Sequence, residues 1–366
     1  MKIAITGLSN AGKTTVFNAL TGLNIETTAY PTLTGEPSLG TVKVPDHRID
    51  RLKEIFRPKK TTYATVNYID YIGLTKGDKV QNSKVFEHIK DADTVVHVVR
   101  AFSDSAVSHP MNHLDPLADF EILELELILG DLEFIERRLQ RIQDSEKKGK
   151  KANPEERALL LRCKSALEQE RPLRSIDFNE TENAIMRPMQ FLSDKPEIVV
   201  INISEEDLNT PRQAELEEAI KEVAQNKGIG HQLQVLSLCG KLEMEIAQLG
   251  AEEADAFLQD MGIREPVRER LIKVSYGMLG LISFLTYGED EVRAWTIRRG
   301  DNAQKAAGKI HSDIERGFIR AEVIAFEDFL SCGGSMVKAK EKGLVRLEGK
   351  TYEVRDGDMI HFRFNV

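Results

Sequence analysis

Residues 7–14 read Gly7-Leu8-Ser9-Asn10-Ala11-Gly12-Lys13-Thr14 and match the phosphate-binding pattern G-x-x-x-x-G-K-[ST] at every fixed position. We expect a hydrophobic strand over 2–6 immediately before this loop and a helix over 13–21 immediately after it. The glycines allow the backbone to curl so that successive N–H groups point at phosphate oxygens, and the helix N-terminus adds a favourable dipole. The motif in this context predicts a P-loop nucleoside triphosphatase.

The side chains of this loop have distinct expected roles. Lys13 supplies a positive charge to the β- and γ-phosphates, and the Thr14 hydroxyl coordinates Mg²⁺. A carboxamide oxygen at Asn10 could also hold a monovalent cation such as K⁺ near the phosphates. The predicted nucleotide contacts of the loop are Asn10, Ala11, Gly12, Lys13, Thr14 and Thr15.

A second motif, Asp70-Tyr71-Ile72-Gly73, ends a hydrophobic strand predicted over 63–70. We expect the Asp70 carboxylate to hold Mg²⁺ through water and the Gly73 N–H to contact the γ-phosphate, so that the following loop senses hydrolysis. Between the two motifs lies Tyr30-Pro31-Thr32-Leu33-Thr34, a candidate first switch. Thr34 is preferred over Thr32 as the second hydroxyl ligand of Mg²⁺.

The residue after this second motif departs from the usual pattern. Many GTPases carry a glutamine there that orients the attacking water, whereas this chain carries Leu74. An isobutyl group cannot orient water. Intrinsic hydrolysis should therefore be slow unless another group or a partner supplies the function.

Base specificity depends on the segment that follows a strand predicted over 197–202. Guanine specificity usually comes from N-K-x-D, but this segment reads Asn202-Ile203-Ser204-Glu205. Because Lys becomes Ile and Asp becomes the longer Glu, strict GTP specificity is not expected. The similar string Thr75-Lys76-Gly77-Asp78 lies in the switch loop, so we interpret it as a chance match.

From about Pro116 the apolar periodicity becomes that of a long helix. An a/d seam is formed by Leu125, Ile128, Leu132, Ile135, Leu139 and Ile142. Gly149 and Pro154 break the pattern, and a second helix is predicted over 155–170. We expect an antiparallel hairpin with a basic tip at Lys147–Lys151, which is either a solvated loop or a contact with RNA or an acidic partner.

The strand pattern resumes over 197–202 and 232–238, so the hairpin interrupts the nucleotide domain. After 280, short strand-like runs surround one helix predicted over 302–316, which indicates a small α+β module. The fold class is therefore α/β. The expected domains are 1–115 with 196–280 for the nucleotide, 116–195 for the inserted hairpin and 281–366 for the C-terminal module.

Composition excludes several functional classes. Hydrophobic residues make up 41% and charged residues 30% of the chain, as in soluble globular proteins. The net charge of −9 argues against a general nucleic-acid binder. No apolar run approaches the ~20 residues needed to span a bilayer, and the three cysteines form neither a zinc ligand set nor a disulfide framework. We expect a cytoplasmic protein without a membrane partner.

The P-loop continues into Val16-Phe17-Asn18-Ala19-Leu20-Thr21, and the C-terminal block contains Val292-Arg293-Ala294-Trp295-Thr296 and Gly317-Phe318-Ile319-Arg320-Ala321-Glu322-Val323. With Asn202–Glu205, these segments resemble the YchF family, the Obg-like ATPases. The resemblance covers essentially the whole chain. It implies a Ras-like P-loop NTPase domain, an inserted α-helical coiled-coil hairpin and a C-terminal TGS domain of β-grasp form.

The resemblance also implies an enzyme that binds ATP, with GTP second, hydrolyses it with Mg²⁺ and associates with the ribosome or a ribosomal subunit. Family members carry a hydrophobic residue in place of the catalytic glutamine and a catalytic histidine on a loop after the strand predicted over 94–100. By register from Pro116 and Asp119, that histidine is His109, and His113 lies close by. The alternative interpretation is that both are ordinary loop histidines without a catalytic role. The implied catalytic residues are Lys13, Gly73 and His109.

Further contacts follow from the same resemblance. The main chain at Ile203 reads the base, and Cys239-Gly240-Lys241 corresponds to the loop on the ribose side. The implied base-side residues are Asn202, Ile203, Glu205, Cys239 and Gly240. The TGS domain and the hairpin are implied to bind the ribosome or RNA, and the candidate cations, which could equally be solvated, are Lys338, Lys340, Lys342, Arg346 and Lys350.

Our leading hypothesis is a slow ATPase that acts as a translation or stress-response switch on the ribosome. One alternative is a strict GTPase translation factor. Another is a nucleotide-gated module that binds the ribosome or RNA and whose turnover is incidental. Turnover that the ribosome stimulates strongly favours the switch, whereas binding without stimulation favours the module.

Overall fold

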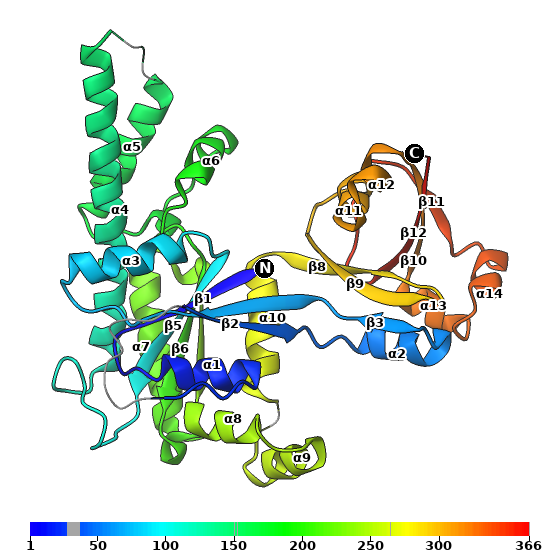
Figure 1. The fold of residues 1–366 in the computed structure, drawn as a ribbon, viewed down its shortest axis with the longest axis horizontal. Coiled ribbons are helices and arrows are strands. Elements are labelled where there is room, and N and C mark those ends of the chain that lie inside the picture. Colours follow the sequence, from blue (N-terminus) through cyan, green and yellow to red (C-terminus); the bar gives the residue numbers. More distant parts are fainter. Residues whose placement is uncertain (28–36, 150, 152, 264, 366) are drawn as a thin grey trace. The chain divides into compact units, whose positions relative to one another are not determined.

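The chain folds into two units in the computed structural model, which describes residues 1–27, 37–149, 151, 153–263 and 265–365 (Figure 1). The first unit comprises Met1–Val42 and Asn67–Leu271, and the second comprises Lys43–Val66 and Ile272–Val366. Among the described residues, no helix combines the length and the apolar character that crossing a membrane requires.

A six-stranded sheet forms the centre of the first unit, with the order β2-β4-β1-β5-β6-β7. The strands are β1 (Lys2–Thr6), β2 (Ser38–Lys43), β4 (Thr65–Asp70), β5 (Thr94–Ala101), β6 (Glu197–Ile203) and β7 (Leu233–Leu238). β1 pairs in parallel with β4 and β5, and the β5–β6 and β6–β7 pairs are also parallel. The strand order reverses at β1, and ligands of such sheets bind outside the carboxyl ends of the strands at this point.

Helices cover the sheet of the first unit. They are α1 (Lys13–Thr21), α3 (Lys79–Ile89), α7 (Pro211–Asn226), α8 (Gly240–Ile246), α9 (Ala251–Asp260) and the start of α10 (Val267–Met278). Short 3₁₀ helices lie at Leu173–Ser175, Arg187–Met189, Glu205–Asp207 and Gly230–Gln232. α3 packs through Val85 and Phe86 in one core cluster and α7 through Ile220 and Ala224 in another, whereas α1 packs against α8. Every residue of β5 and β6 is buried, as in strands covered on both faces.

The predicted hairpin is formed by α4 (Pro116–Lys147) and α5 (Pro154–Leu167), which pack against each other, and α6 (Glu180–Met186) lies at their base (Figure 1). Five of the six seam residues belong to its core, which also contains Leu160 and Cys163; these five are Ile128, Leu132, Ile135, Leu139 and Ile142. Leu125 is the exception, because it lines a cavity beside Met111. The second helix ends three residues earlier than predicted, at Leu167 instead of residue 170.

Four buried carboxylates tie the first half of α4 to the rest of the first unit. They are Asp119, Glu124, Glu126 and Asp131. In the same order they contact the ring of His109, the guanidinium of Arg174, the N–H of Gly77 and the N–H of Ser193. Because buried carboxylates need partners, α4 is fixed to four separate segments before it enters the hairpin.

The second unit is built on a mixed sheet with the order β11-β10-β12-β8-β9-β3. Its strands are β3 (Lys60–Thr62), β8 (Leu281–Thr286), β9 (Glu291–Arg298), β10 (Phe318–Ala325), β11 (Arg346–Glu348) and β12 (Asp358–Phe364). The β8–β12 pair is parallel, and β8–β9 and β10–β12 are antiparallel. The helices are α2 (His47–Phe56), α11 (Ala303–Ile310), α12 (Ser312–Arg316), α13 (Phe326–Ser331) and α14 (Met336–Glu341). A mixed sheet with a helix packed across it is the predicted β-grasp arrangement.

One predicted helix is divided. The sequence indicated a single helix over 302–316, but His311 has extended backbone angles, with φ −162° and ψ 144°, and separates α11 from α12. The His311 side chain accepts a hydrogen bond from the Asp313 N–H and so caps the second helix. The local cap outweighs the helical periodicity.

The two units group the chain differently from the three expected domains. The hairpin belongs to the first unit, through the carboxylates of α4. Residues 43–66, which we expected in the nucleotide domain, belong to the second unit, because β3 pairs with β9 and α2 places Ile49 and Leu52 in the second unit's core. The C-terminal segment of the second unit begins at Ile272 rather than at residue 281.

Candidate nucleotide-binding site

The P-loop connects β1 to α1, as predicted, and its glycines are required by close approaches. A Cβ on Gly7 would lie 2.3 Å from the carbonyl oxygen of Val98, and a Cβ on Gly12, which has φ +86°, would lie 2.3 Å from the Asn202 Nδ2. Side chains at these positions would collide with a neighbouring strand or with Asn202. The loop therefore lies closely over the carboxyl ends of β5 and β6.

Lys13 is buried within the loop, with 8% of its surface exposed. Its Nζ donates a hydrogen bond of 2.9 Å to the carbonyl oxygen of Leu8. Burial lowers the pKa of Lys13 to about 8, and the negative charge of Asp70 partly opposes this shift. A buried ammonium with one carbonyl partner is short of negative charge, which phosphate oxygens would supply.

Thr14 and Asp70 meet at the mouth of the loop. The Thr14 hydroxyl donates a hydrogen bond of 2.7 Å to Oδ2 of Asp70. The other oxygen, Oδ1, is buried and has no hydrogen-bond partner among the described residues. Burial raises the pKa of Asp70, while the Thr14 bond and the charge of Lys13 lower it. A buried carboxylate oxygen without a partner, beside a hydroxyl, suits a hydrated divalent cation.

Gly73 lies directly against the P-loop. A Cβ on this residue would lie 2.7 Å from the Lys13 Nζ and 2.8 Å from the Cα of Ser9. The next residue, Leu74, donates its N–H to the carbonyl oxygen of Gly7 at 3.0 Å. The Leu74 side chain is fully buried in the core cluster that α3 and α4 share, so it offers no group to the phosphate site.

Asn202 connects the P-loop to the loop between β7 and α8. Its Nδ2 donates to the carbonyl oxygen of Ala11 at 3.2 Å, and its Oδ1 accepts from the Gly240 N–H at 2.9 Å. A Cβ on Gly240 would lie 2.9 Å from the same Oδ1. The side chain is 4% exposed, and these two backbone contacts give both ends of the buried carboxamide a hydrogen-bond partner. Asn202 therefore joins the P-loop to the loop between β7 and α8.

The other residues predicted to bind the base or ribose lie nearby along the chain. Ile203 ends β6 and is 1% exposed, Glu205 is exposed at the start of a 3₁₀ helix, and Cys239 precedes α8. Burial raises the pKa of the Cys239 thiol. Because Asn202 and Leu238 are paired in register at the ends of β6 and β7, these segments meet at one edge of the sheet. Thr15 is half-buried on α1, and Thr34 lies outside the described residues.

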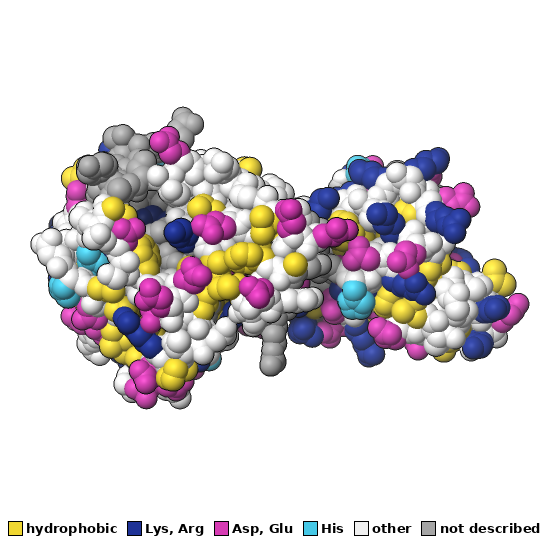
Figure 2. Space-filling model, turned by 90° about the horizontal axis from the view of Figure 1, so that it is seen from below, with side chains coloured by type: hydrophobic (Ala, Val, Ile, Leu, Met, Phe, Trp, Pro, Cys, Tyr) yellow, Lys and Arg dark blue, Asp and Glu magenta, His cyan; other side chains and the backbone are white. Residues whose placement is uncertain are grey.

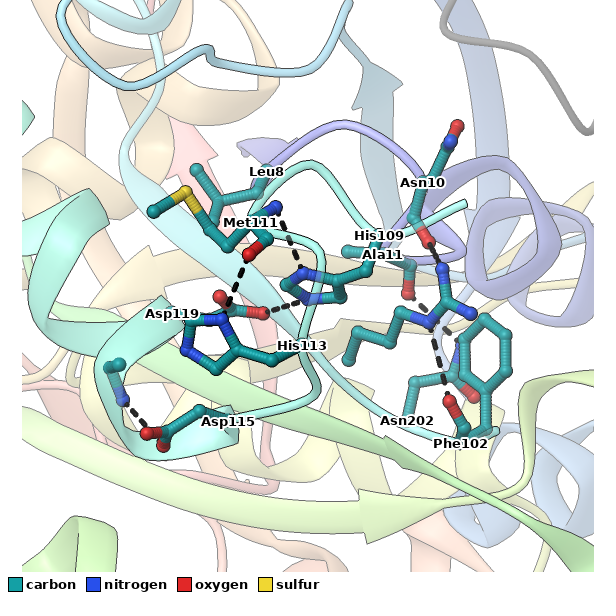
Figure 3. A network of polar contacts seen from close by, with 12 residues as sticks. Leu8, Asn10, Ala11, Phe102, His109, Met111, His113, Asp115, Asp119 and Asn202 are labelled. Carbon is teal, nitrogen blue, oxygen red and sulfur yellow. Dashed lines mark hydrogen bonds and ion pairs between the residues drawn. The ribbon is translucent and has the colours of Figure 1, made fainter. Parts of the chain in front are cut away.

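His109 lies in the segment between β5 and α4, and Figure 3 shows its ring between Met111 and Asp119. Its Nδ1 accepts a hydrogen bond of 3.1 Å from the Met111 N–H. Its Nε2 therefore carries the proton and faces Oδ2 of Asp119 at 2.9 Å. Both side chains are largely buried, and burial raises the pKa of Asp119. The ring contacts α4, and His113 donates from its Nδ1 to the Met111 carbonyl.

Sequence reasoning did not identify Arg100, which joins this histidine-bearing segment to the P-loop. The guanidinium donates to the carbonyl oxygens of Val107 at 2.9 Å and Ser108 at 3.4 Å, and to that of Asn10 at 3.5 Å. Asn10, which has φ 61°, also donates its side-chain amide to the Ser108 carbonyl at 2.9 Å. The available signal was an arginine within a strand that is mostly apolar.

A loop of this geometry, at the point where the order of a parallel sheet reverses, is the arrangement with which P-loop nucleoside triphosphatases hold phosphates, and the chain is of that class. Residues 2–128 match a family described as 50S ribosome-binding GTPase. Residues 281–365 match YchF-GTPase_C, described as a protein of unknown function (DUF933).

Relatives extend this match over the whole chain. "Ribosome-binding ATPase YchF" of Bacillus subtilis (strain 168) is 44% identical over 365 residues, which cover 99% of this chain and 98% of the relative. The protein of that name from Escherichia coli O157:H7 is 40% identical over 369 residues, which cover 100% and 99%. The solved structure of the Schizosaccharomyces pombe YchF GTPase has a TM-score of 0.81 at 28% identity and covers 99% of this chain and 97% of its own. The chain belongs to the YchF family.

Proposed function

We propose that the chain is a slow, Mg²⁺-dependent ATPase that acts as a nucleotide-dependent switch on the ribosome, in translation or a stress response. The observation that carries this proposal is the cluster of Lys13, Thr14, Asp70 and Gly73 around one loop. The full-length relatives are named ribosome-binding ATPases, which supports both the reaction and the partner. A ribosomal partner places the proposed site of action in the cytoplasm.

Thr14 and, through water, Asp70 would hold Mg²⁺ in this proposal, with Thr34 as the second hydroxyl ligand. The buried Oδ1 of Asp70, which has no partner among the described residues, supports a cation there. Bound Mg²⁺ would neutralise charge that develops on the transferred phosphoryl group. The Lys13 ammonium would contact the β- and γ-phosphates, and the Gly73 N–H would contact the γ-phosphate.

ATP is the proposed nucleotide, with GTP second. The segment after β6 lacks the lysine and aspartate of the guanine motif, and its asparagine is bonded to protein backbone. The proposed base and ribose contacts are Asn202, Ile203, Glu205, Cys239 and Gly240. Strict GTP hydrolysis is the second candidate, which the description of the family matched by residues 2–128 and the name of the Schizosaccharomyces pombe relative favour.

His109 is the proposed catalytic histidine. Both of its ring nitrogens are engaged by Met111 and Asp119, so it must release one of them to act on the substrate. We expect His109→Ala to slow hydrolysis and to leave nucleotide affinity nearly unchanged. Undiminished turnover would remove His109 from the mechanism.

A monovalent cation such as K⁺ at Asn10 is a separate part of the proposal. The carboxamide oxygen of Asn10 is the group that would hold it close to the phosphates. The amide nitrogen of the same side chain donates to the Ser108 carbonyl, which fixes the orientation of the carboxamide. A hydrolysis rate that is the same in Na⁺ and in K⁺ would count against this role.

The hairpin (116–195) and the TGS domain (281–366) are the proposed contacts with the ribosome or RNA. A cavity of about 650 Å³ beside α4 is lined by four basic side chains, Lys90, Arg137, Arg138 and Arg141, and by two acidic ones, Glu87 and Glu156. Lys90 pairs with Glu87 and Arg138 with Glu156, so the positive excess comes from Arg137 and Arg141, which would suit an anionic partner at the hairpin. At its tip, Lys147 and Lys148 are exposed.

Support from the TGS domain is weaker. Of its candidate cations, Lys340 lies 3.2 Å from Glu322, and Arg346 lies 3.0 Å from Glu348. The visible face of the second unit carries basic and acidic side chains side by side (Figure 2). A merely solvated face fits this pairing as well as an RNA contact does.

Calorimetric titration tests the nucleotide site first. Protein free of nucleotide is titrated with non-hydrolysable ATP and GTP analogues in Mg²⁺, and Lys13→Ala serves as the control. The proposal predicts tighter binding of the ATP analogue, lost in the control. Tighter binding of the GTP analogue would support the second candidate, and equal binding by Lys13→Ala would refute the site. Ribosomes added to a turnover assay then separate the switch, which they stimulate strongly, from the module.

A further inference from the structure

The loop that follows Gly73 is held by side chains from α3 and α4. Asn82, which is fully buried, accepts from the Thr75 N–H at 3.1 Å and donates to the Thr75 carbonyl at 2.8 Å. Glu126 accepts from the Gly77 N–H at 2.7 Å and from the Asn82 amide at 2.8 Å. These bonds fix the middle of the loop. In its first peptide the Leu74 N–H donates to the Gly7 carbonyl, and the Gly73 carbonyl is bound by another group.

That group is Gln81, in the first turn of α3. Its Nε2 donates a hydrogen bond of 2.9 Å to the carbonyl oxygen of Gly73. Gly73 packs closely against Lys13, since a Cβ added to it would lie 2.7 Å from the Lys13 Nζ. The bond from Gln81 therefore acts on a residue that lies directly against the lysine of the P-loop.

Gln81 places a carboxamide beside Gly73, whereas position 74, where many GTPases carry a glutamine, is a leucine in this chain. The Leu74 side chain is fully buried in the core, so residue 74 contributes only its backbone. Gln81 reaches the preceding peptide from a neighbouring helix, eight residues along the chain from Gly73. A glutamine thus supports the D-x-x-G motif from a different position in the sequence.

We propose that Gln81 is a positioning residue for γ-phosphate recognition, a role that rests on the proposed function of the site. Its hydrogen bond, together with that of the Leu74 N–H to Gly7, holds the peptide that follows the Gly73 Cα and so restricts the backbone rotations that redirect the Gly73 N–H. With the bond in place, the N–H is preorganised for the γ-phosphate. Without it, the Gly73–Leu74 peptide keeps only the bond from the Leu74 N–H to the Gly7 carbonyl, so the backbone at Gly73 is held less firmly, and ordering it opposes binding.

The consequence distinguishes ATP from ADP. The net free energy of one neutral hydrogen bond corresponds to about a fivefold change in a binding constant. ADP has no γ-phosphate, so its affinity does not depend on how the Gly73 N–H is directed. Loss of the Gln81 donor should therefore weaken an ATP analogue selectively.

The test compares Gln81→Met, which keeps the length of the side chain and removes the donor, with Lys84→Ala, an exposed site on the same helix. Both full-length variants and the wild type are titrated with a non-hydrolysable ATP analogue and with ADP in Mg²⁺. For Gln81→Met we expect about a fivefold loss of affinity for the analogue and less than a twofold change for ADP. Lys84→Ala should bind both nucleotides like the wild type.

Gln81→Ala repeats the measurement with a shorter side chain, and should show the same selective loss. Equal losses for the analogue and for ADP would show that Gln81 only supports the fold and would overturn the proposal, as would unchanged affinity for both. Failure of the wild type to bind either nucleotide would instead refute the proposed function, and with it the basis of this role. Selective loss in the two Gln81 variants, with a wild type that binds both nucleotides, supports the positioning role alone.

Discussion

Replacing Gly73 by alanine is the sharpest test of how the D-x-x-G loop meets the P-loop. The added Cβ would lie 2.7 Å from the Lys13 Nζ and 2.8 and 2.9 Å from the Cα and N of Ser9. Two of these three atoms are backbone and cannot rotate away. The loop must therefore shift off the P-loop, at an overpacking cost of about 1–3 kcal/mol.

The shift should appear as lost affinity for the γ-phosphate. A hydrogen bond to a charged group contributes about 2 kcal/mol, so we expect a non-hydrolysable ATP analogue to bind about 30-fold more weakly. ADP should be affected much less, because the proposed contact of Gly73 is with the third phosphate alone. Calorimetric titration of both nucleotides in Mg²⁺ measures the difference.

Gly77→Ala is the matched control in the same loop. Gly77 has φ +74°, and an added Cβ meets no atom within 4 Å, so the change introduces backbone strain without a collision. That strain costs about 1–2 kcal/mol of stability, but nucleotide affinity should stay unchanged. If Gly73→Ala binds the ATP analogue as tightly as the wild type does, the proposed contact between Gly73 and the γ-phosphate is wrong.

Three further predictions use the same site and its support. Because the pKa of Lys13 is lowered to about 8 and phosphates would raise it, ATP-analogue affinity should be constant below that pH and fall above it by up to about tenfold per pH unit; a flat profile contradicts this. Thr14→Val removes the donor to Asp70, so Mg²⁺ should no longer tighten nucleotide binding, which titration with and without EDTA measures. Arg174→Met leaves Glu124 and Glu197 buried without their cation, and should lower the free energy of unfolding by about 3–5 kcal/mol in urea denaturation; a change below about 1 kcal/mol contradicts the ion pairs.

The parts of the fold that sequence predicted well are those with local signals. The P-loop lies between β1 and α1 because its glycines and its lysine act over a few residues. The hairpin follows from the regular spacing of Ile128, Ile135 and Ile142, which indeed face α5. The position of Asp70 at the end of β4 follows equally from a short hydrophobic run.

The parts that sequence did not predict depend on contacts between distant segments. β3 has only three residues, and its pairing with β9 has no periodic signal, so residues 43–66 were expected in the wrong unit. Asn202 stays a predicted nucleotide contact, but the hydrogen bonds of its carboxamide to Ala11 and Gly240 were not predicted, because they depend on the spacing of two loops. The roles of Arg100 and Gln81 likewise depend on how far a side chain reaches across the fold.

α4 also makes the first unit a lever. Its 32 residues span about 48 Å at the usual helical rise, and the carboxylates that hold it to His109 and Gly77 lie in the half nearest the sheet. Beyond that fixed half about 24 Å of helix remains, so a tilt of about 5° would carry the hairpin tip through about 2 Å. Conversely, a force applied at the hairpin tip would be transmitted along α4 to the hydrogen bonds of its fixed half, including the one between Asp119 and His109.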